Sequence, residues 1–382
     1  MFREKQGIDL RTGHCVKSLN TARREVSGTT LTGGAFQVNY DKLLIATGAT
    51  PRVPNVPGSD LPGVMVLKNL EDGRRMKQFV RDNQVRKAVI LGMGYIAMEM
   101  CEALRSRDIE VDMVKPGPVF IPWMNPELSS FVKKELEVNR VGIHLGRVPR
   151  GITKTGAGLK VICENLDLDC QMVLIAVGVK PCSDLAEKSG LSLGPSESIS
   201  VDRKMLTSDG NIYAAGDCAD AYHVVTGKKA WIPLALRANR AGWAVADNVL
   251  GAGIELEGVA GTAVYKVFDL EVARTGLSLE EAKKHGFDPS EAVIESRTRA
   301  HTYPGGSPLF VQVVGDRESG RLLGVQIVGK EGAAHRINAP AVALHARMTV
   351  RDFSQSDLAY APPFGPSWDP MLTAANQLLK AL

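Results

Sequence analysis

The sequence predicts an α/β protein in which two parallel-sheet domains precede a smaller α+β domain, and two observations carry this prediction. The first is the stretch 87–115, where a short apolar run, a glycine-rich turn and a helical segment lead to a second apolar strand at residues 109–114. Apolar runs this short, bounded by turn residues, are typical of fully buried parallel strands. The second is the change at Gly261 to alternating strands separated by turn residues, which indicates a third, α+β domain.

Short apolar strands that end in a small-residue turn recur at residues 43–48, 173–178 and 212–217. Their order implies two nucleotide-type sheets, the first of which is interrupted in sequence by the second. We therefore predict one domain from residues 1–66 and 184–258, a second from 67–183 and a third from 260–382. Helical patterns are expected at 69–83, 126–140, 232–248 and 333–346.

The turn after the strand at 88–91 reads Gly92-Met93-Gly94-Tyr95-Ile96-Ala97. In a βαβ unit the first glycine permits the tight turn, the second lets the backbone approach a pyrophosphate, and the small third residue lets helix and strand pack closely. Main-chain N–H groups and the dipole at the helix start favour phosphate. A strand precedes this turn, and a helix and a second strand follow it, as the dinucleotide-binding motif requires. We therefore favour dinucleotide binding over a tight turn without a ligand.

Composition excludes several classes of protein. The chain has 382 residues and a net charge of +4 without a basic block, so nucleic acid is not indicated as a partner. No apolar run approaches a membrane span, and the charged start lacks the apolar core of a signal peptide, so we expect a cytoplasmic protein. None of the six cysteines forms a C-x-x-C or a zinc-finger spacing, so no metal site is expected.

Five ordered segments together resemble one known family: YDKLLIATGATPRVPNVPG, VILGMGYIAMEM, NIYAAGDCAD, IPLALRANRAG and DLAYAPPF. The sequence is similar to the pyridine nucleotide-disulfide oxidoreductases, and within them to coenzyme A-disulfide reductases, persulfide reductases and NADH oxidases. The resemblance implies two Rossmann-like domains of FAD and NAD(P) type, the first incomplete here, and a C-terminal dimerisation domain. It implies electron transfer from NAD(P)H through FAD to a disulfide, persulfide or oxygen, with the acceptor left open, and a homodimer.

The resemblance also assigns cofactor residues by position. The residues expected to bind FAD are Thr47, Gly48, Asp217, Pro233 and Ala235. For Asp217, an ordinary helix cap is the alternative. The residues expected to bind NAD(P) are Gly92, Gly94, Tyr95, Ala97, Glu99, Lys115 and Gly178. For Glu99, the alternative is a solvated helix residue.

Further residues match family positions with different roles. Tyr303 and Tyr360 correspond to tyrosines that reach the partner subunit's active site and act as proton donors, with plain aromatic packing as the alternative. Cys218 lies at a packing position, and His345 lacks the H-P motif of the glutathione reductase branch. We expect both to be structural.

The sequence departs from the family pattern in two ways. It begins after the family's FAD-binding G-x-G-x-x-G unit and redox cysteine, so we expect the chain by itself to hold FAD poorly and not to turn over disulfides. A non-catalytic, dimeric nucleotide-binding protein is the alternative function. In addition, Lys115 replaces the acidic residue that accepts the ribose hydroxyls of NAD, which predicts a preference for NADPH.

Overall fold

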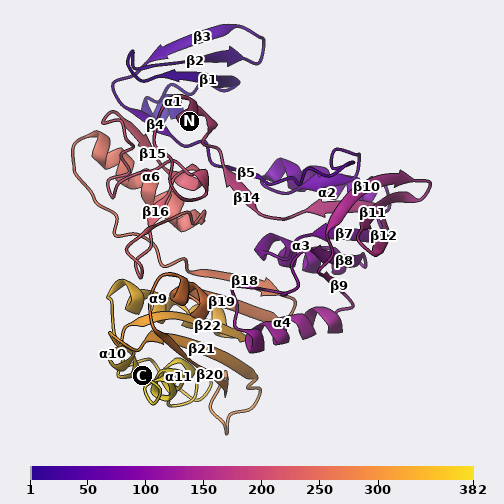
Figure 1. Cartoon of the computed structure of the whole chain (residues 1–382), viewed down its shortest axis with the longest axis vertical. Coiled ribbons are helices and arrows are strands. Elements are labelled where there is room, and N and C mark those ends of the chain that lie inside the picture. Colours follow the sequence, from indigo (N-terminus) through magenta and orange to yellow (C-terminus); the bar gives the residue numbers. More distant parts are fainter. Residues whose placement is uncertain (1) are drawn as a thin grey trace. The chain divides into compact units, whose positions relative to one another are not determined.

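The computed structural model describes residues 2–382 (Figure 1). The chain divides into two compact units, and each combines segments that are distant in the sequence. Unit 1 consists of Met1–Thr50, Lys180–His223 and Gly227–Val259, and unit 2 of Pro51–Val179, Val224–Thr226 and Ala260–Leu382. The predicted three-domain boundaries remain a prediction.

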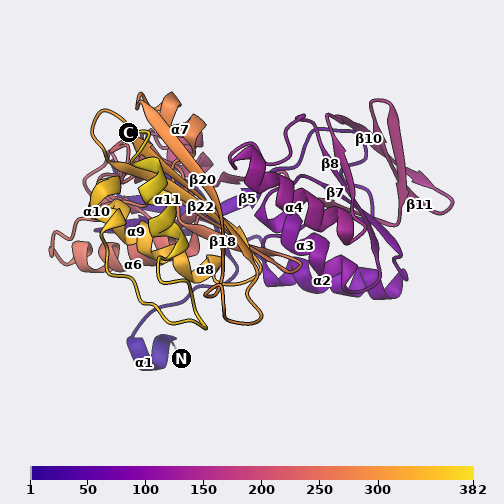
Figure 2. The same ribbon diagram turned by 90° about the horizontal axis from the view of Figure 1, so that it is seen from below.

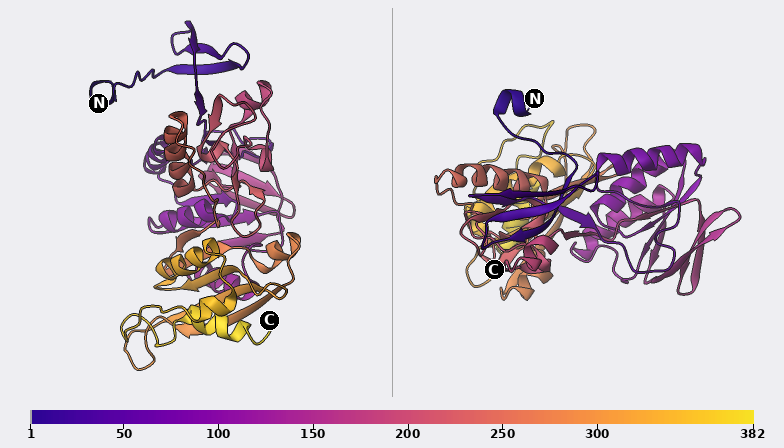
Figure 3. Two further views of the ribbon diagram at one scale, coloured as in Figure 1. Left: turned by 90° about the vertical axis from the view of Figure 1, so that its left-hand side faces the viewer. Right: turned by 90° about the horizontal axis from the view of Figure 1, so that it is seen from above.

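Unit 1 contains an antiparallel three-stranded sheet and a short parallel pair, β4 with β15. Figure 3 shows the three-stranded sheet edge-on and from its face. A buried core that includes Ile45, Ile212 and Val245 joins the parallel pair to helix α6. The elements are α1 (Phe2–Gln6), β1 (His14–Asn20), β2 (Glu25–Thr30), β3 (Ala35–Asn39), β4 (Leu43–Ile45), α5 (Asp184–Lys188), η1 (Pro195–Glu197), β15 (Ile212–Ala214), η2 (Gly216–Cys218), β16 (Ala221–Tyr222), β17 (Lys229–Ala230) and α6 (Ala235–Val249). The chain passes between the units at β5 (Ala49–Pro51) and β14 (Val179–Pro181).

The first half of unit 2 is a five-stranded parallel sheet in the order β6-β13-β7-β8-β9. Successive residues of β7 point to opposite faces: Ala88 and Ile90 pack with the helices, whereas Val89 and Leu91 pack with a three-stranded antiparallel sheet (Figure 2). This two-sided burial explains the continuous apolar run in the sequence. The elements are β6 (Val64–Val66), α2 (Leu70–Asp82), β7 (Lys87–Leu91), α3 (Tyr95–Arg105), β8 (Glu110–Lys115), α4 (Pro126–Val138), β9 (Gly142–Leu145), β10 (Pro149–Thr155), β11 (Gly158–Cys163), β12 (Leu166–Cys170) and β13 (Met172–Ile175).

The second half of unit 2 is an antiparallel sheet in the order β18-β19-β22-β21-β20. A core that includes Val313, Ile327, Leu344 and Phe353 lies between this sheet and the C-terminal helices. The elements are β18 (Ala263–Val267), β19 (Leu270–Gly276), α7 (Leu279–Lys284), β20 (Pro289–Arg297), β21 (Pro308–Asp316), β22 (Leu322–Gly329), α8 (Ala333–Arg336), α9 (Asn338–His345), α10 (Val350–Ser354) and α11 (Pro370–Leu378).

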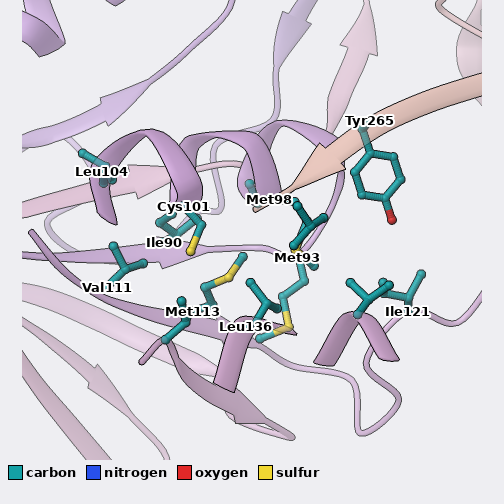
Figure 4. Close-up of a cluster of buried hydrophobic side chains, with 14 of the residues drawn as sticks. Ile90, Met93, Met98, Cys101, Leu104, Val111, Met113, Ile121, Leu136 and Tyr265 are labelled. Atoms are coloured by element: carbon teal, nitrogen blue, oxygen red, sulfur yellow. The ribbon is translucent and has the colours of Figure 1, made fainter. Parts of the chain in front are cut away.

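One buried cluster joins the two halves of unit 2. It contains Met98 and Met113 from the nucleotide-type sheet and its helix, and Tyr265 and Phe310 from the C-terminal sheet. Figure 4 shows Tyr265 reaching toward Met93 and Met98 at the start of α3. The C-terminal sheet is therefore packed directly against the helical layer of the parallel sheet.

The structure confirms the βαβ unit and most of the predicted elements, but it corrects two helices. The segment predicted as one helix at 333–346 is two, α8 and α9, because Pro340 has no N–H for Arg336 O and its ring would clash there in a continuous helix. The helix predicted from residue 232 begins at Ala235, since Leu234 is extended (φ −120°, ψ 143°).

Candidate functional site

Three of the predicted nucleotide residues lie at one edge of the parallel sheet. Gly92 directly follows β7, Lys115 is the last residue of β8, and Gly178 comes shortly after β13. β7 pairs in parallel with both β8 and β13, so the carboxyl ends of the three strands meet at this edge. Ligands of open α/β sheets bind in the crevice outside these strand ends.

Gly92 occupies a conformation that requires glycine. Its φ is +118°, and a Cβ atom there would lie 2.3 Å from the Ala176 carbonyl oxygen. The Gly92 N–H donates to the Val114 carbonyl oxygen at 2.9 Å. The turn therefore runs tightly between the ends of β8 and β13, in agreement with the role predicted for the first glycine of the motif.

Gly94 and Ala97 have different surroundings. Gly94 is the N-cap of α3, no side chain caps this helix start, and no atom lies within 4 Å of a Cβ built on Gly94. Ala97 is fully buried where α3 packs on the sheet. The first N–H groups of a helix have no intrahelical partner. An uncapped helix start beside open space can hold a diphosphate.

Tyr95 belongs to an aromatic cluster that sequence reasoning missed. Its ring stacks on Tyr265 with centroids 4.8 Å apart and meets the Trp123 ring edge-on at 5.8 Å. Burial raises the pKa of the Tyr95 phenol. Trp123 follows the strand that ends in Lys115, so its place in the crossover loop could have drawn attention to it. Nothing in the sequence linked Tyr265 to the nucleotide turn, because it comes from a separate part of the chain.

Glu99 and Lys115 differ in what they contact. The Glu99 side chain is exposed, and partial burial of its carboxyl group together with nearby Glu102 raises its pKa. The Lys115 ammonium group donates to the carbonyl oxygens of Val119 at 2.7 Å and Phe120 at 3.1 Å, and burial lowers its pKa. Lys115 thus fixes the loop that follows β8 and keeps one N–H for another acceptor.

The residues predicted to contact FAD lie in unit 1. The Thr47 hydroxyl donates to the Cys182 carbonyl oxygen at 2.5 Å, and Gly48 has φ +71°. Asp217 lies in the η2 turn, whose backbone is held by Trp231 Nε1, which donates to the Asp217 carbonyl oxygen at 2.8 Å.

These surroundings fit a flavin nucleotide. Pro233 precedes α6, Ala235 is its first residue, and no side chain caps this helix start. No atom lies within 4 Å of a Cβ built on Gly48. An uncapped helix start and a strand-end carboxylate suit phosphates and ribityl hydroxyls. If FAD binds here, these residues would hold it, and the flavin would supply the electron relay.

The two predicted tyrosines lie on neighbouring exposed loops of unit 2. Tyr303 is 38% exposed and Tyr360 is 51% exposed. The Ala300 N–H donates to the Pro362 carbonyl oxygen at 3.0 Å, which ties the two loops together. His345 ends α9.

The cysteines fall into buried and accessible groups. Burial raises the pKa of Cys101 to about 12 and that of Cys170 to about 11, so neither thiol is a ready nucleophile. Cys218 is buried, and its thiol donates to the Ala215 and Ile45 carbonyl oxygens. Cys15 is exposed and Cys182 is partly exposed. Among the described residues, no cluster of side chains could hold a metal ion.

Comparison with known proteins identifies the family. Residues 1–242 match the pyridine nucleotide-disulphide oxidoreductase family, and residues 262–371 match its dimerisation domain. The chain belongs to the pyridine nucleotide-disulphide oxidoreductase family. It is an oxidoreductase, and the cofactors of its family are FAD and NAD(P)H.

Relatives place the protein in the predicted branch of this family. It is 38% identical over 379 residues to an NAD(P)H sulfur oxidoreductase (CoA-dependent) of Pyrococcus furiosus, covering 99% of this chain and 85% of the relative. It is 31% identical over 366 residues to a coenzyme A disulfide reductase of Staphylococcus aureus, covering 95% and 82%. The structure of an NAD-dependent persulfide reductase from A. fulgidus superimposes with a TM-score of 0.95 at 33% identity, covering 100% of this chain and 70% of that one.

These comparisons confirm the family, the branch and the fold class, and they favour an enzyme over the non-catalytic alternative. Over the part of the chain that the structure describes, no helix has the length and apolar character needed to cross a membrane. The individual site residues remain predictions.

The two glycines of the turn allow a paired test of this oxidoreductase. Gly92→Ala should destabilise the fold by about 1–3 kcal/mol, because alanine is strained at this φ and meets the Ala176 carbonyl oxygen. Gly94→Ala should destabilise the fold by less than about 1 kcal/mol, because alanine is a poorer N-cap but is unstrained at a φ of −88° with open space, and it should weaken NADPH binding about tenfold. Urea unfolding and calorimetric titration measure both effects. Unchanged binding in Gly94→Ala would contradict the assignment.

Proposed function

We propose that this oxidoreductase reduces a small disulfide or persulfide with electrons from NAD(P)H passed through FAD, with oxygen as the alternative acceptor. The strand ends at Gly92, Gly94 and Gly178 carry the proposal, because they combine an uncapped helix start, glycines with no atom within 4 Å of an added Cβ at Gly94 and Gly178, and converging parallel strands. The relatives described above are named for sulfur, coenzyme A disulfide and persulfide substrates, which supports the choice of acceptor.

In this proposal, NAD(P)H and one proton reduce one sulfur–sulfur bond, which gives two thiols from a disulfide or one thiol and hydrogen sulfide from a persulfide. The hydride supplies the electron pair, and each sulfur takes up a proton. Tyr303 and Tyr360 are exposed phenols on tied loops and are proposed as proton donors. We assign no redox role to the buried cysteines, because burial opposes their thiolate forms.

The acceptor can be identified in anaerobic assays of protein whose FAD content has been measured. We expect NADPH oxidation to depend on coenzyme A disulfide or a persulfide, and each NADPH consumed should give two thiols when the acceptor is a disulfide. Nicotinamide absorbance and a thiol reagent follow the two quantities. Oxidation that requires oxygen and yields no thiol would contradict sulfur–sulfur reduction. FAD-loaded protein that oxidises NADPH with none of these acceptors would contradict the proposed reaction as a whole.

We also propose that NADPH is the preferred nucleotide. Lys115 ends β8, where an acidic residue would accept ribose hydroxyls and repel a 2′-phosphate. Its ammonium group donates two of its three N–H groups to backbone carbonyl oxygens, and the third can donate to a phosphate oxygen. Partial burial strengthens such a contact, because fewer water molecules compete for the charge.

Replacing the lysine should reverse the preference. Lys115→Glu should weaken NADPH binding about tenfold or more relative to NADH binding, since it exchanges an attractive charge for a repulsive one at the 2′-phosphate. The matched control is Lys133→Glu, a surface position on α4 that pairs with Glu137. Calorimetric titration with each nucleotide measures the ratio. Tighter binding of NADH than of NADPH by the unmodified protein would refute the preference.

We further propose a homodimer formed by residues 260–382, with the segment 360–364 against the partner's flavin-binding domain. The segment carries Tyr360 and Phe364, which are 51% and 77% exposed, and nearby Trp368 is 61% exposed. Exposed aromatic groups of this size mark interaction surfaces. The consecutive residues Pro362 and Pro363 stiffen the segment, so presenting it to a partner costs little ordering entropy.

A charge placed on this surface should weaken the dimer. Phe364→Asp should destabilise association by about 2 kcal/mol or more, because it removes an aromatic anchor and buries a carboxylate. Leu70→Asp is the control, since Leu70 is 81% exposed on α2, outside the proposed interface. Sedimentation across micromolar concentrations compares the variants. A monomeric unmodified protein at these concentrations would rule out the proposed dimer.

A further inference from the structure

The aromatic cluster at the nucleotide turn is built from three separate segments. Tyr95 is the first residue of α3, Trp123 lies in the loop between β8 and α4, and Tyr265 comes from β18 of the C-terminal sheet. Tyr95 and Tyr265 stack with centroids 4.8 Å apart, and Trp123 meets both rings edge-on, at 5.8 Å and 6.4 Å. Aromatic pairs at these distances favour a fixed mutual orientation.

A fourth side chain, Arg274 of β19, covers the cluster. Its guanidinium carbon lies 4.8 Å from the centre of the Trp123 ring. The group also forms an ion pair with Glu281 at 2.7 Å and donates to the Gly276 carbonyl oxygen at 3.0 Å. The Arg274 side chain is only 13% exposed. Its main polar contacts are therefore within the protein, and it is poorly placed to bind a phosphate itself.

The electrostatics of the ion pair support a fixed guanidinium. Burial acts to raise the pKa of Glu281, but the charge of Arg274 and hydrogen bonds from Ser278 and Arg274 lower it overall. Glu281 also belongs to the capping box of α7, since its carboxylate accepts from the Ser278 N–H at 2.8 Å. The C-terminal sheet and α7 thus hold Arg274 in place over Trp123.

The Trp123 loop is anchored to the same sheet through its backbone. Gln326 of β22 donates from Nε2 to the Trp123 carbonyl oxygen at 3.0 Å and accepts from the Asn125 N–H at 2.9 Å. Gln326 is 2% exposed, so these hydrogen bonds lie out of water. The other end of the loop is held by Lys115. The loop that follows Lys115 is therefore held at its far end by contacts from the C-terminal sheet.

We propose that Arg274 is a positioning residue for NAD(P)H, acting through the Trp123 ring to fix the loop that follows Lys115 and the neighbouring Tyr95 at the nucleotide turn. The C-terminal sheet then contributes to nucleotide affinity without touching the nucleotide. This inference rests on the proposed function, because it concerns how the same crevice binds its cofactor.

A mutant cycle in the full chain tests the proposal, with NADPH as the probe and calorimetric titration as the measurement. Arg274→Met should raise the dissociation constant about 5- to 10-fold, the size expected for a largely desolvated cation–π contact and its loop. Trp123→Ala should raise it at least as much. Because Arg274 acts through Trp123, the double variant should bind no more weakly than Trp123→Ala alone.

Two further variants separate positioning from general loss of stability. Arg336 lies on α8, a helix that packs on β19 and β22, and forms an ion pair with Asp369 in which both side chains are 13% exposed. Arg336→Met removes this ion pair. It should lower the urea midpoint as Arg274→Met does, yet keep the NADPH dissociation constant within about twofold. Arg274→Lys keeps a charge for Glu281 but lacks the flat guanidinium, so it should fold and recover part of the affinity.

Several results would overturn the proposal. The first is an unchanged NADPH dissociation constant in Arg274→Met. The second is additive losses of NADPH affinity in the double variant, which would mean that Arg274 contacts the nucleotide directly. The third is an equal loss of NADPH affinity in Arg336→Met. Failure of the unmodified protein to bind either NADPH or NADH would instead refute the proposed function and remove the basis of this inference. Binding by the unmodified protein with no effect of Arg274→Met or Arg274→Lys would refute the inference alone.

Discussion

Unit 2 depends on one continuous apolar core shared by the parallel sheet's helices and the C-terminal sheet. Phe131 of α4 stacks on Phe310 of β21 with ring centroids 3.6 Å apart, and fully buried Met98 and Met113 belong to the same cluster as Val328. Burying an apolar side chain of this size contributes about 1.5–3 kcal/mol. Without the C-terminal sheet, the outer surfaces of α3 and α4 would be exposed to water.

Polar groups fix the register of this packing. Gln312 and Gln326 lie side by side on the central strands of the C-terminal sheet, where apolar residues otherwise dominate. Gln326 binds the backbone at the start of α4, and Gln312 donates to Glu291. A buried amide is costly unless it is hydrogen-bonded, so Gln326, which bonds to the Trp123 and Asn125 backbone, favours one alignment of the two halves over others of equal hydrophobicity.

This packing gives the nucleotide crevice its particular form. The glycine turn needs only the parallel sheet itself, since Gly92 is confined by Ala176 at the end of the neighbouring strand β13. The aromatic cluster and the loop after Lys115 depend on the C-terminal sheet, which supplies Tyr265, Arg274 and Gln326.

The sequence by itself determined the βαβ unit and the glycine turn, because these follow from hydrophobic runs, turn residues and their spacing along the chain. It also encodes the cap of α4 locally, because the Asn125 side chain accepts from the N–H groups of Glu127 and Leu128, two and three residues later. It did not separate α8 from α9 in our prediction, although Pro340 is a local signal for a break, since it has no N–H for the carbonyl oxygen four residues earlier. Nor could it place Tyr265 on Tyr95 or Arg274 over Trp123, since residues so far apart in sequence meet only when two sheets pack into one core. Only the tertiary structure decided those contacts.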